Sequence, residues 1–149
     1  MGCDIHIHAE RRLPSGQWSA IRYLKPFSAP DYGVFGWLAG VRNYSALTPI
    51  SEPRGLPSRV SDTVARDYAI WSGDAHDASW LSVAELRAVD YEQIVEDRRC
   101  TRNGNGGSTC EPGEGKKQTL REFLGLGFFR GLDALVAAGA ERVVFWFDN

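Results

Sequence analysis

The first ten residues carry the side chains of this sequence that are best suited to acid–base or metal chemistry. Two of the three histidines, His6 and His8, are separated by a single residue, and an acidic residue precedes and follows them. In a β-strand, successive side chains point to opposite faces. One face of such a strand then carries two acids and two imidazoles, which can bind a metal ion or transfer protons. These residues are Asp4, His6, His8 and Glu10.

The other face of the same stretch is apolar. It consists of Cys3, Ile5, Ile7 and Ala9. A turn is predicted at residues 14–16, where Pro, Ser and Gly occur together. Residues 17–23 are rich in aromatic and β-branched side chains and predict a returning strand. We therefore expect a hairpin that holds the polar face in place.

Two further polar clusters lie elsewhere in the sequence. Gly73-Asp74-Ala75-His76-Asp77 places the third histidine in a predicted loop, where it has no evident packing purpose. Asp148 follows the apolar run 143–147, which is typical of a central strand buried on both faces. We expect the three clusters to converge in one site.

In this interpretation, Asp4, His6 and Asp148 bind a divalent metal (Mg²⁺, Mn²⁺ or Zn²⁺) or position a water molecule. Asp4 and His6 are also assigned to catalysis, His76 is the predicted acid–base catalyst, and Asp74 is the residue that orients it.

Four other polar residues receive different interpretations. Arg42 and Arg54 are predicted to bind an anionic group of the ligand, because guanidinium groups pair with phosphate. His8 and Glu10 are predicted to be surface residues. Simpler explanations apply to the whole set: an exposed strand face is commonly polar, aspartates form turns, and arginines form surface ion pairs.

Composition restricts the class of protein. Of the 149 residues, 43% are apolar and 11% are aromatic, which indicates a globular protein with a hydrophobic core. The net charge of −2 gives no general attraction to nucleic acid or to an anionic membrane, so neither is an expected partner. No apolar run suits a signal peptide or a membrane span. The three cysteines lack metal-site spacing and fit free thiols in the cytoplasm.

The remaining pattern predicts a single α+β domain over residues 1–149, with a flexible loop at about 101–117. This loop region is dominated by Gly, Asn, Ser, Glu and Lys. We expect a small sheet, made of the N-terminal hairpin and the buried C-terminal strand, packed by three to four helices. The helices are expected to begin at polar caps. The caps are Asp31, Ser58 or Ser61, Ser82 and Thr119.

Several motifs together resemble a family of small, uncharacterised proteins of tailed bacteriophages and prophages. They are Gly2-Cys3-Asp4-Ile5-His6, Leu38-Ala39-Gly40-Val41-Arg42, Pro53-Arg54-Gly55-Leu56-Pro57, Gly73-Asp74-Ala75-His76 with Ser79-Trp80-Leu81, and Val144-Phe145-Trp146-Phe147-Asp148-Asn149. The resemblance implies a phage origin and the host cytoplasm as the location, but no particular reaction. In one departure, Pro30-Asp31-Tyr32 stands where the family often has Arg-Asn-Tyr.

These observations predict a phage accessory protein that hydrolyses a small phosphate-bearing or nucleotide ligand with the help of a divalent metal. A counter-defence role follows only by analogy with the phage setting. Two alternatives stay open: a binding protein that sequesters a host signalling nucleotide without turnover, and an interaction protein that inhibits a host factor. The sequence also leaves open whether the chain forms a homo-oligomer.

Overall fold

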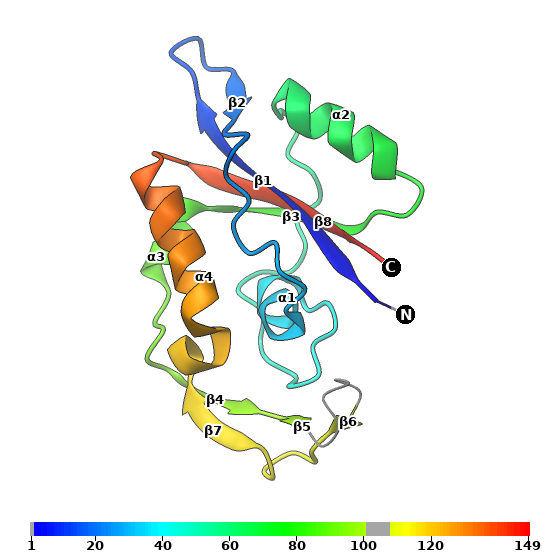
Figure 1. Ribbon diagram of the computed structural model, residues 1–149, viewed down its shortest axis with the longest axis vertical. Coiled ribbons are helices and arrows are strands. Elements are labelled where there is room, and N and C mark those ends of the chain that lie inside the picture. Colours follow the sequence, from blue (N-terminus) through cyan, green and yellow to red (C-terminus); the bar gives the residue numbers. More distant parts are fainter. Residues whose placement is uncertain (1, 101–107) are drawn as a thin grey trace. The chain divides into compact units, whose positions relative to one another are not determined.

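A four-stranded antiparallel sheet is the largest element of the structure, a computed structural model that describes residues 2–100 and 108–149. The strand order is β2-β1-β8-β3, so the first and last strands of the chain are neighbours (Figure 1). The strands are β1 (Asp4–Arg12), β2 (Trp18–Ala20), β3 (His76–Ser82) and β8 (Arg142–Asp148). Residues 142–147 of the central strand β8 are all buried, as predicted for a strand covered on both faces.

The register of β1 on β8 decides which side chains share a face. Ile5 lies opposite Phe147, and His6 lies opposite Trp146. Because directly opposed residues point to the same side of a sheet, one face is apolar and the other carries the polar residues of β1. The predicted alternation is thereby confirmed, and the antiparallel pairing of β1 with β2, in which Arg12 lies opposite Trp18, confirms the hairpin.

Residue contacts divide the chain into two compact units. The first comprises Met1–Pro30, Pro53–Val89 and Gly127–Asn149 and contains the four-stranded sheet. On its polar face lies α2 (Asp62–Trp71), which begins after Ser61, whose hydroxyl accepts a hydrogen bond from the Val64 amide. Apolar side chains join this helix to the sheet. Val64, Val144 and Trp146 form the buried centre, and Leu56, Val60, Tyr68, Trp71 and Trp80 pack around it.

Two other helices begin at the predicted caps. At the start of α3 (Val83–Ala88), Ser82 and Glu85 form a complete capping box. At the start of α4 (Leu120–Ala137), the Thr119 hydroxyl accepts a hydrogen bond from the Glu122 amide. Helix α4 is interrupted at Gly125, where φ is 81° and ψ is 171°, a conformation open to glycine because it lacks a Cβ atom.

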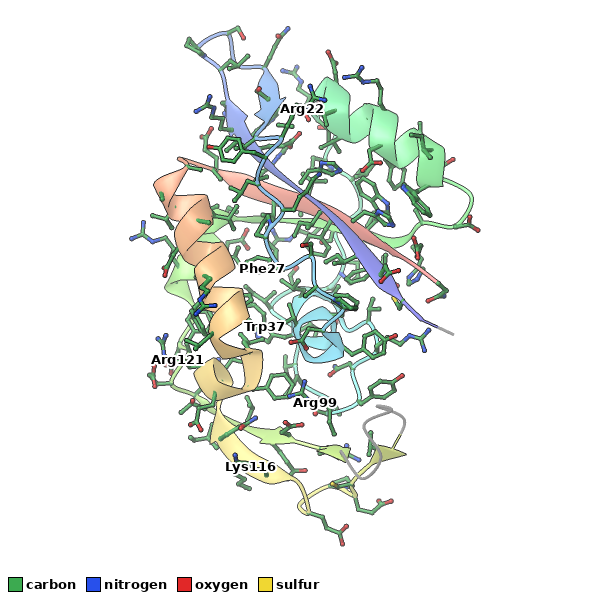
Figure 2. The ribbon with its side chains drawn as sticks, in the orientation of Figure 1. Arg22, Phe27, Trp37, Arg99, Lys116 and Arg121 are labelled. Carbon is green, nitrogen blue, oxygen red and sulfur yellow. The ribbon has the colours of Figure 1, made fainter. Side chains whose placement is uncertain are left out.

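The second unit comprises Asp31–Glu52 and Asp90–Leu126. It contains α1 (Tyr32–Ala39), which is capped by Asp31 as predicted, and two small sheets that pair β4 with β7 and β5 with β6. These strands are β4 (Ile94–Asp97), β5 (Arg99–Cys100), β6 (Ser108–Thr109) and β7 (Lys116–Thr119). Arg99 is held by Asp97 and lies 4.2 Å from the centre of the Phe123 ring (Figure 2). An aromatic contact between Trp37 and Tyr91 also lies within this unit.

The α+β fold class is confirmed, but two local predictions differ from the structure. His76 does not lie in a loop, because it opens β3, which pairs with the buried strand β8. Of the predicted loop at 101–117, residues 101–107 lie outside the described residues. Within the remainder, Ser108–Thr109 forms β6, and Lys116–Thr119 forms β7, which extends beyond it.

Candidate functional site

The polar residues of β1 point toward α2 and form three consecutive pairs along the strand. Alternation places every second residue of β1 on this face, and α2 packs over it through Val64, Tyr68 and Trp71. The three pairs differ in the exposure of the β1 side chain, which falls along the strand from 20% for His6 to 5% for His8 and 0% for Glu10.

The first pair joins His6 to Asp148. The imidazole Nε2 lies 2.6 Å from Asp148 Oδ2, and the two side chains are 20% and 14% exposed. The His6 ring centre lies 4.2 Å from that of Trp71 and 5.8 Å from that of Trp146. Two aromatic rings therefore hold the imidazole while one side of it stays accessible. Among the described residues, His6 Nδ1 has no hydrogen-bond partner.

Asp4 is the third predicted member of this cluster. Its Cα position is directly opposite that of Asp148 in the β1–β8 register, and its side chain is exposed. Asp4, His6 and Asp148 thus come from the adjoining ends of two neighbouring strands and share one face. The structure brings these three predicted residues to the same end of the sheet.

The second pair joins a buried histidine to a partly exposed aspartate and belongs to a chain of polar contacts. Lys25 Nζ lies 3.0 Å from His8 Nδ1, and His8 Nε2 lies 2.6 Å from Asp67 Oδ2. Both ring nitrogens are therefore engaged. Burial lowers the pKa of His8, and this effect outweighs the hydrogen bond to Asp67, which acts in the opposite direction. A neutral ring that donates from Nε2 and accepts from the Lys25 ammonium fits this arrangement.

The third pair is an enclosed ion pair. Glu10 is completely buried, and its Oε1 accepts a hydrogen bond of 2.8 Å from Arg142 Nε. Its other oxygen accepts from the Ser61 amide at 2.7 Å, which links β1 to the start of α2. Arg142 also donates to the Arg59 carbonyl. Every partner needed to offset the burial of this carboxylate is present.

The prediction that His8 and Glu10 are surface residues is therefore wrong. Their side chains are buried because α2 covers this part of the strand, and a strand pattern alone does not tell whether its polar face meets water or another element.

His76 is not part of the His6 cluster. It pairs with Phe147 in the β3–β8 register, and its ring stacks near the Phe147 ring with the centres 6.1 Å apart. Since Phe147 shares a face with Ile5, the sheet separates His76 from His6. The predicted convergence of all three clusters is thus corrected: the first and third meet, and the histidine of the second lies on the opposite face of the sheet.

The partner of His76 also differs from the predicted one. Its Nδ1 lies 2.7 Å from Asp77 Oδ2, so Asp77, rather than Asp74, orients the ring. Asp74 is exposed in the turn after α2, where its amide donates to the Trp71 carbonyl. Within the described part of the chain, the buried His76 Nε2 has no hydrogen-bond partner.

The two arginines predicted to bind ligand have other surroundings. The Arg54 guanidinium forms two hydrogen bonds to the Glu85 carboxylate, of 2.9 and 2.5 Å, and lies 4.7 Å from the Trp80 ring centre. This hydrogen bonding lowers the pKa of Glu85 to about 2. Arg42 belongs to the second unit, where its guanidinium lies 5.7 Å from the Tyr32 ring centre.

Sequence reasoning missed a different group of basic and aromatic side chains. Arg12 and Arg142 lie 4.8 and 3.5 Å from the ring centre of Trp18. The alternation of β1 places Arg12 on the same face as Glu10, and this was a usable signal. The approach of Arg142 depends on the pairing of β1 with β8, which has no local signature in the sequence.

No protein-family model, curated protein or solved structure matches this chain. Among the described residues, none of the helices is long and apolar enough to cross a membrane.

Proposed function

We propose that this chain is a hydrolase for a small phosphate-bearing ligand, with His6 as its general base. One observation supports the proposal above the others: Asp148 engages Nε2 of a partly exposed imidazole whose Nδ1 has no partner in the described part of the chain. A histidine held in this way has a fixed ring and one nitrogen available for proton transfer.

The proposed proton transfer follows from this geometry. With its proton on Nε2 and directed at Asp148, the neutral ring presents the Nδ1 lone pair. Nδ1 takes a proton from a water molecule as the water attacks the phosphorus atom, and the bond from phosphorus to the ester oxygen breaks. The Asp148 carboxylate stabilises the imidazolium that forms, and the departing oxygen takes up a proton from solvent or from this imidazolium, so that an alcohol and a phosphate are released. Trp71 and Trp146 restrict rotation of the ring, so orienting it for proton transfer costs little additional entropy.

The metal remains a prediction. Two carboxylates and an imidazole are suitable ligands for a divalent cation, which would offset the repulsion between these carboxylates and a phosphate. Within residues 2–100 and 108–149, however, no three such side chains are grouped as metal ligands. We therefore assign no step to a metal and make it a variable of the experiment. The phosphate-bearing ligand itself comes from the sequence interpretation.

The test is an assay of the purified chain against a panel of phosphomonoesters, phosphodiesters and cyclic nucleotides, with EDTA, Mg²⁺, Mn²⁺ or Zn²⁺. We expect turnover of at least one compound. Replacing the base (His6→Gln) or its partner (Asp148→Asn) should lower kcat by roughly 10²- to 10⁴-fold. Asp133→Asn is the matched control, because Asp133 is an exposed residue of α4.

Two results would contradict the proposal. Unchanged kcat in both His6→Gln and Asp148→Asn would remove these residues from catalysis. Recovery of intact ligand from the heated protein, without product in any metal condition, would favour a sequestering protein instead.

A further inference from the structure

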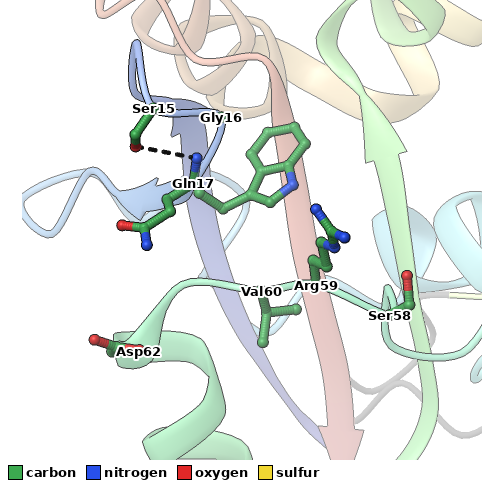
Figure 3. A pocket seen from close by; sticks show the side chains of 8 residues that line it. Ser15, Gly16, Gln17, Ser58, Arg59, Val60 and Asp62 are labelled. Atoms are coloured by element: carbon green, nitrogen blue, oxygen red, sulfur yellow. Dashed lines mark hydrogen bonds between the residues drawn. The ribbon is translucent and has the colours of Figure 1, made fainter.

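A second candidate site lies at the far end of β1 from His6. Two adjoining cavities, of about 510 and 390 Å³, open between the β1–β2 hairpin and the segment that leads into α2. Both are lined by Trp18, Ser58 and Arg59. Figure 3 shows the larger one, with Arg59 extending from the segment before α2 toward the hairpin.

The smaller cavity has a strongly basic lining. Three arginines and two tryptophans contribute to it, and none of the described residues that line it is acidic. Its lining residues are Arg12, Trp18, Leu56, Pro57, Ser58, Arg59, Trp80 and Arg142.

Two of these three positive charges are available to a ligand. Arg142 is buried and is neutralised by Glu10. Arg12 and Arg59 are exposed, and within the described part of the chain neither guanidinium forms an ion pair with a carboxylate. Of the nearby acids, Glu141 accepts a hydrogen bond from the Arg12 amide, and Asp62 lines only the larger cavity. The smaller cavity therefore has an uncompensated positive charge.

The walls of this basic cavity are held in place by packing. The Arg142 guanidinium lies 3.5 Å from the Trp18 ring centre and donates to the Arg59 carbonyl. The buried Glu10–Arg142 pair thus fixes one face of the indole and the backbone that carries Arg59. Such preorganisation reduces the ordering cost when a ligand binds.

We propose that the basic cavity binds the phosphate group of a small phosphomonoester, a sugar phosphate or a nucleotide. Arg12 and Arg59 donate hydrogen bonds to the phosphate oxygens, because a guanidinium matches phosphate geometry with two parallel donors. The hydroxyl-bearing remainder of the ligand lies in the larger cavity, where Ser15, Gln17 and Asp62 supply polar groups.

This site is separate from the proposed catalytic one. Arg12 follows His6 by six residues on the same strand, and at about 3.3 Å per residue the two are roughly 20 Å apart. A phosphate held by Arg12 therefore does not reach His6, so binding here and hydrolysis there can be tested independently.

The experiment is isothermal titration of the full chain with four probes: inorganic phosphate, ribose 5-phosphate, a nucleoside 5′-monophosphate and the corresponding nucleoside. We expect the two phosphomonoesters to bind most tightly and the nucleoside not to bind at millimolar concentration. Arg12→Gln and Arg59→Gln should each weaken binding about 10- to 100-fold. Arg11→Gln is the matched control, since Arg11 is exposed and points to the opposite side of β1.

In a His6→Gln background, which lacks the proposed catalytic base, Arg12→Gln should weaken binding of the probes by the same factor as in the unmodified chain, and this separates the proposal from the catalytic one. Thermal denaturation of each variant confirms that it is folded before titration. Three results would overturn the proposal: no binding of any phosphate-bearing probe, equal binding of the nucleoside and its monophosphate, or a loss in Arg11→Gln as large as that in Arg12→Gln.

Discussion

Two histidines on the same face of β1 contact aspartates at the same distance but occupy different surroundings. His6 and His8 each lie 2.6 Å from an aspartate oxygen. The His6 side chain is 20% exposed, and only one of its nitrogens is engaged within the described residues. The His8 side chain is 5% exposed, and Lys25 and Asp67 engage both of its nitrogens.

The difference shows that an Asp–His pair is not by itself a site. A histidine that transfers protons needs a ring nitrogen that a ligand or water can reach, and both ring nitrogens of His8 are already engaged. Its pair, together with Glu10 and Arg142, instead fastens α2 to the sheet, as the bond from the Ser61 amide to Glu10 indicates. The start of β1 is therefore the candidate catalytic site, whereas His8 and Glu10 on the same face support the fold.

The largest effect on stability is expected at the buried end of this face. Glu10→Ala removes the partner of buried Arg142 and should lower the free energy of unfolding by about 3–5 kcal/mol, measured by urea denaturation. The control replaces both partners, Glu10→Met with Arg142→Met, and should cost less than the single change because no charge is left unpaired. A loss below about 1 kcal/mol for Glu10→Ala would contradict the supporting role.

A smaller loss is expected at His8. His8→Gln leaves Asp67 and Lys25 without their shared partner and should cost about 1–3 kcal/mol at pH 7.

This variant should also change the pH dependence of stability. Because burial lowers the folded-state pKa of His8, the ring is neutral in both states above the unfolded pKa near 6.5. As the pH falls below that value, the unfolded chain takes up the proton more readily, and stability decreases. Denaturation between pH 7 and pH 5 should therefore show a steeper decline in the unmodified chain than in His8→Gln. Parallel profiles would show that His8 does not titrate differently on folding.

Substitutions in the His6–Asp148 pair, at the beginning of β1, should lower activity more than they lower stability. Asp148→Asn keeps a hydrogen-bond acceptor for His6 Nε2 on a partly exposed residue, so the free energy of unfolding should change by about 1 kcal/mol or less. The same urea denaturation measures it. A loss as large as that of Glu10→Ala would make His6–Asp148 a second structural pair and would remove the contrast between the two ends.

The smallest effect is expected at Arg54. Its pair with Glu85 is well formed but lies on the surface, with side chains 27% and 38% exposed, so solvent screens it. Arg54→Lys should change the free energy of unfolding by less than about 1 kcal/mol and should leave the affinity for phosphate probes unaltered. A clear loss of affinity would return Arg54 to its predicted ligand-binding role.

Local patterns were sufficient for much of the fold. The caps at Asp31, Ser61, Ser82 and Thr119 begin helices, because their side chains bond to amides only two or three residues away. The apolar run of β8 likewise predicted a central strand. Strand β3 was missed because its polar start, His76-Asp77, has the composition of a turn, and only pairing with β8 makes it a strand.

The sequence by itself determined which residues of β1 share a face, since alternation is a property of any extended chain. It thereby placed Asp4, His6, His8 and Glu10 together. Only the tertiary structure decided that α2 buries two of them, that Asp148 meets His6, and that Arg12, Arg59 and Trp18 line one cavity. The reason is physical: burial and cross-strand partners depend on segments far apart in the chain, and these segments meet only when the sheet and its helix pack together.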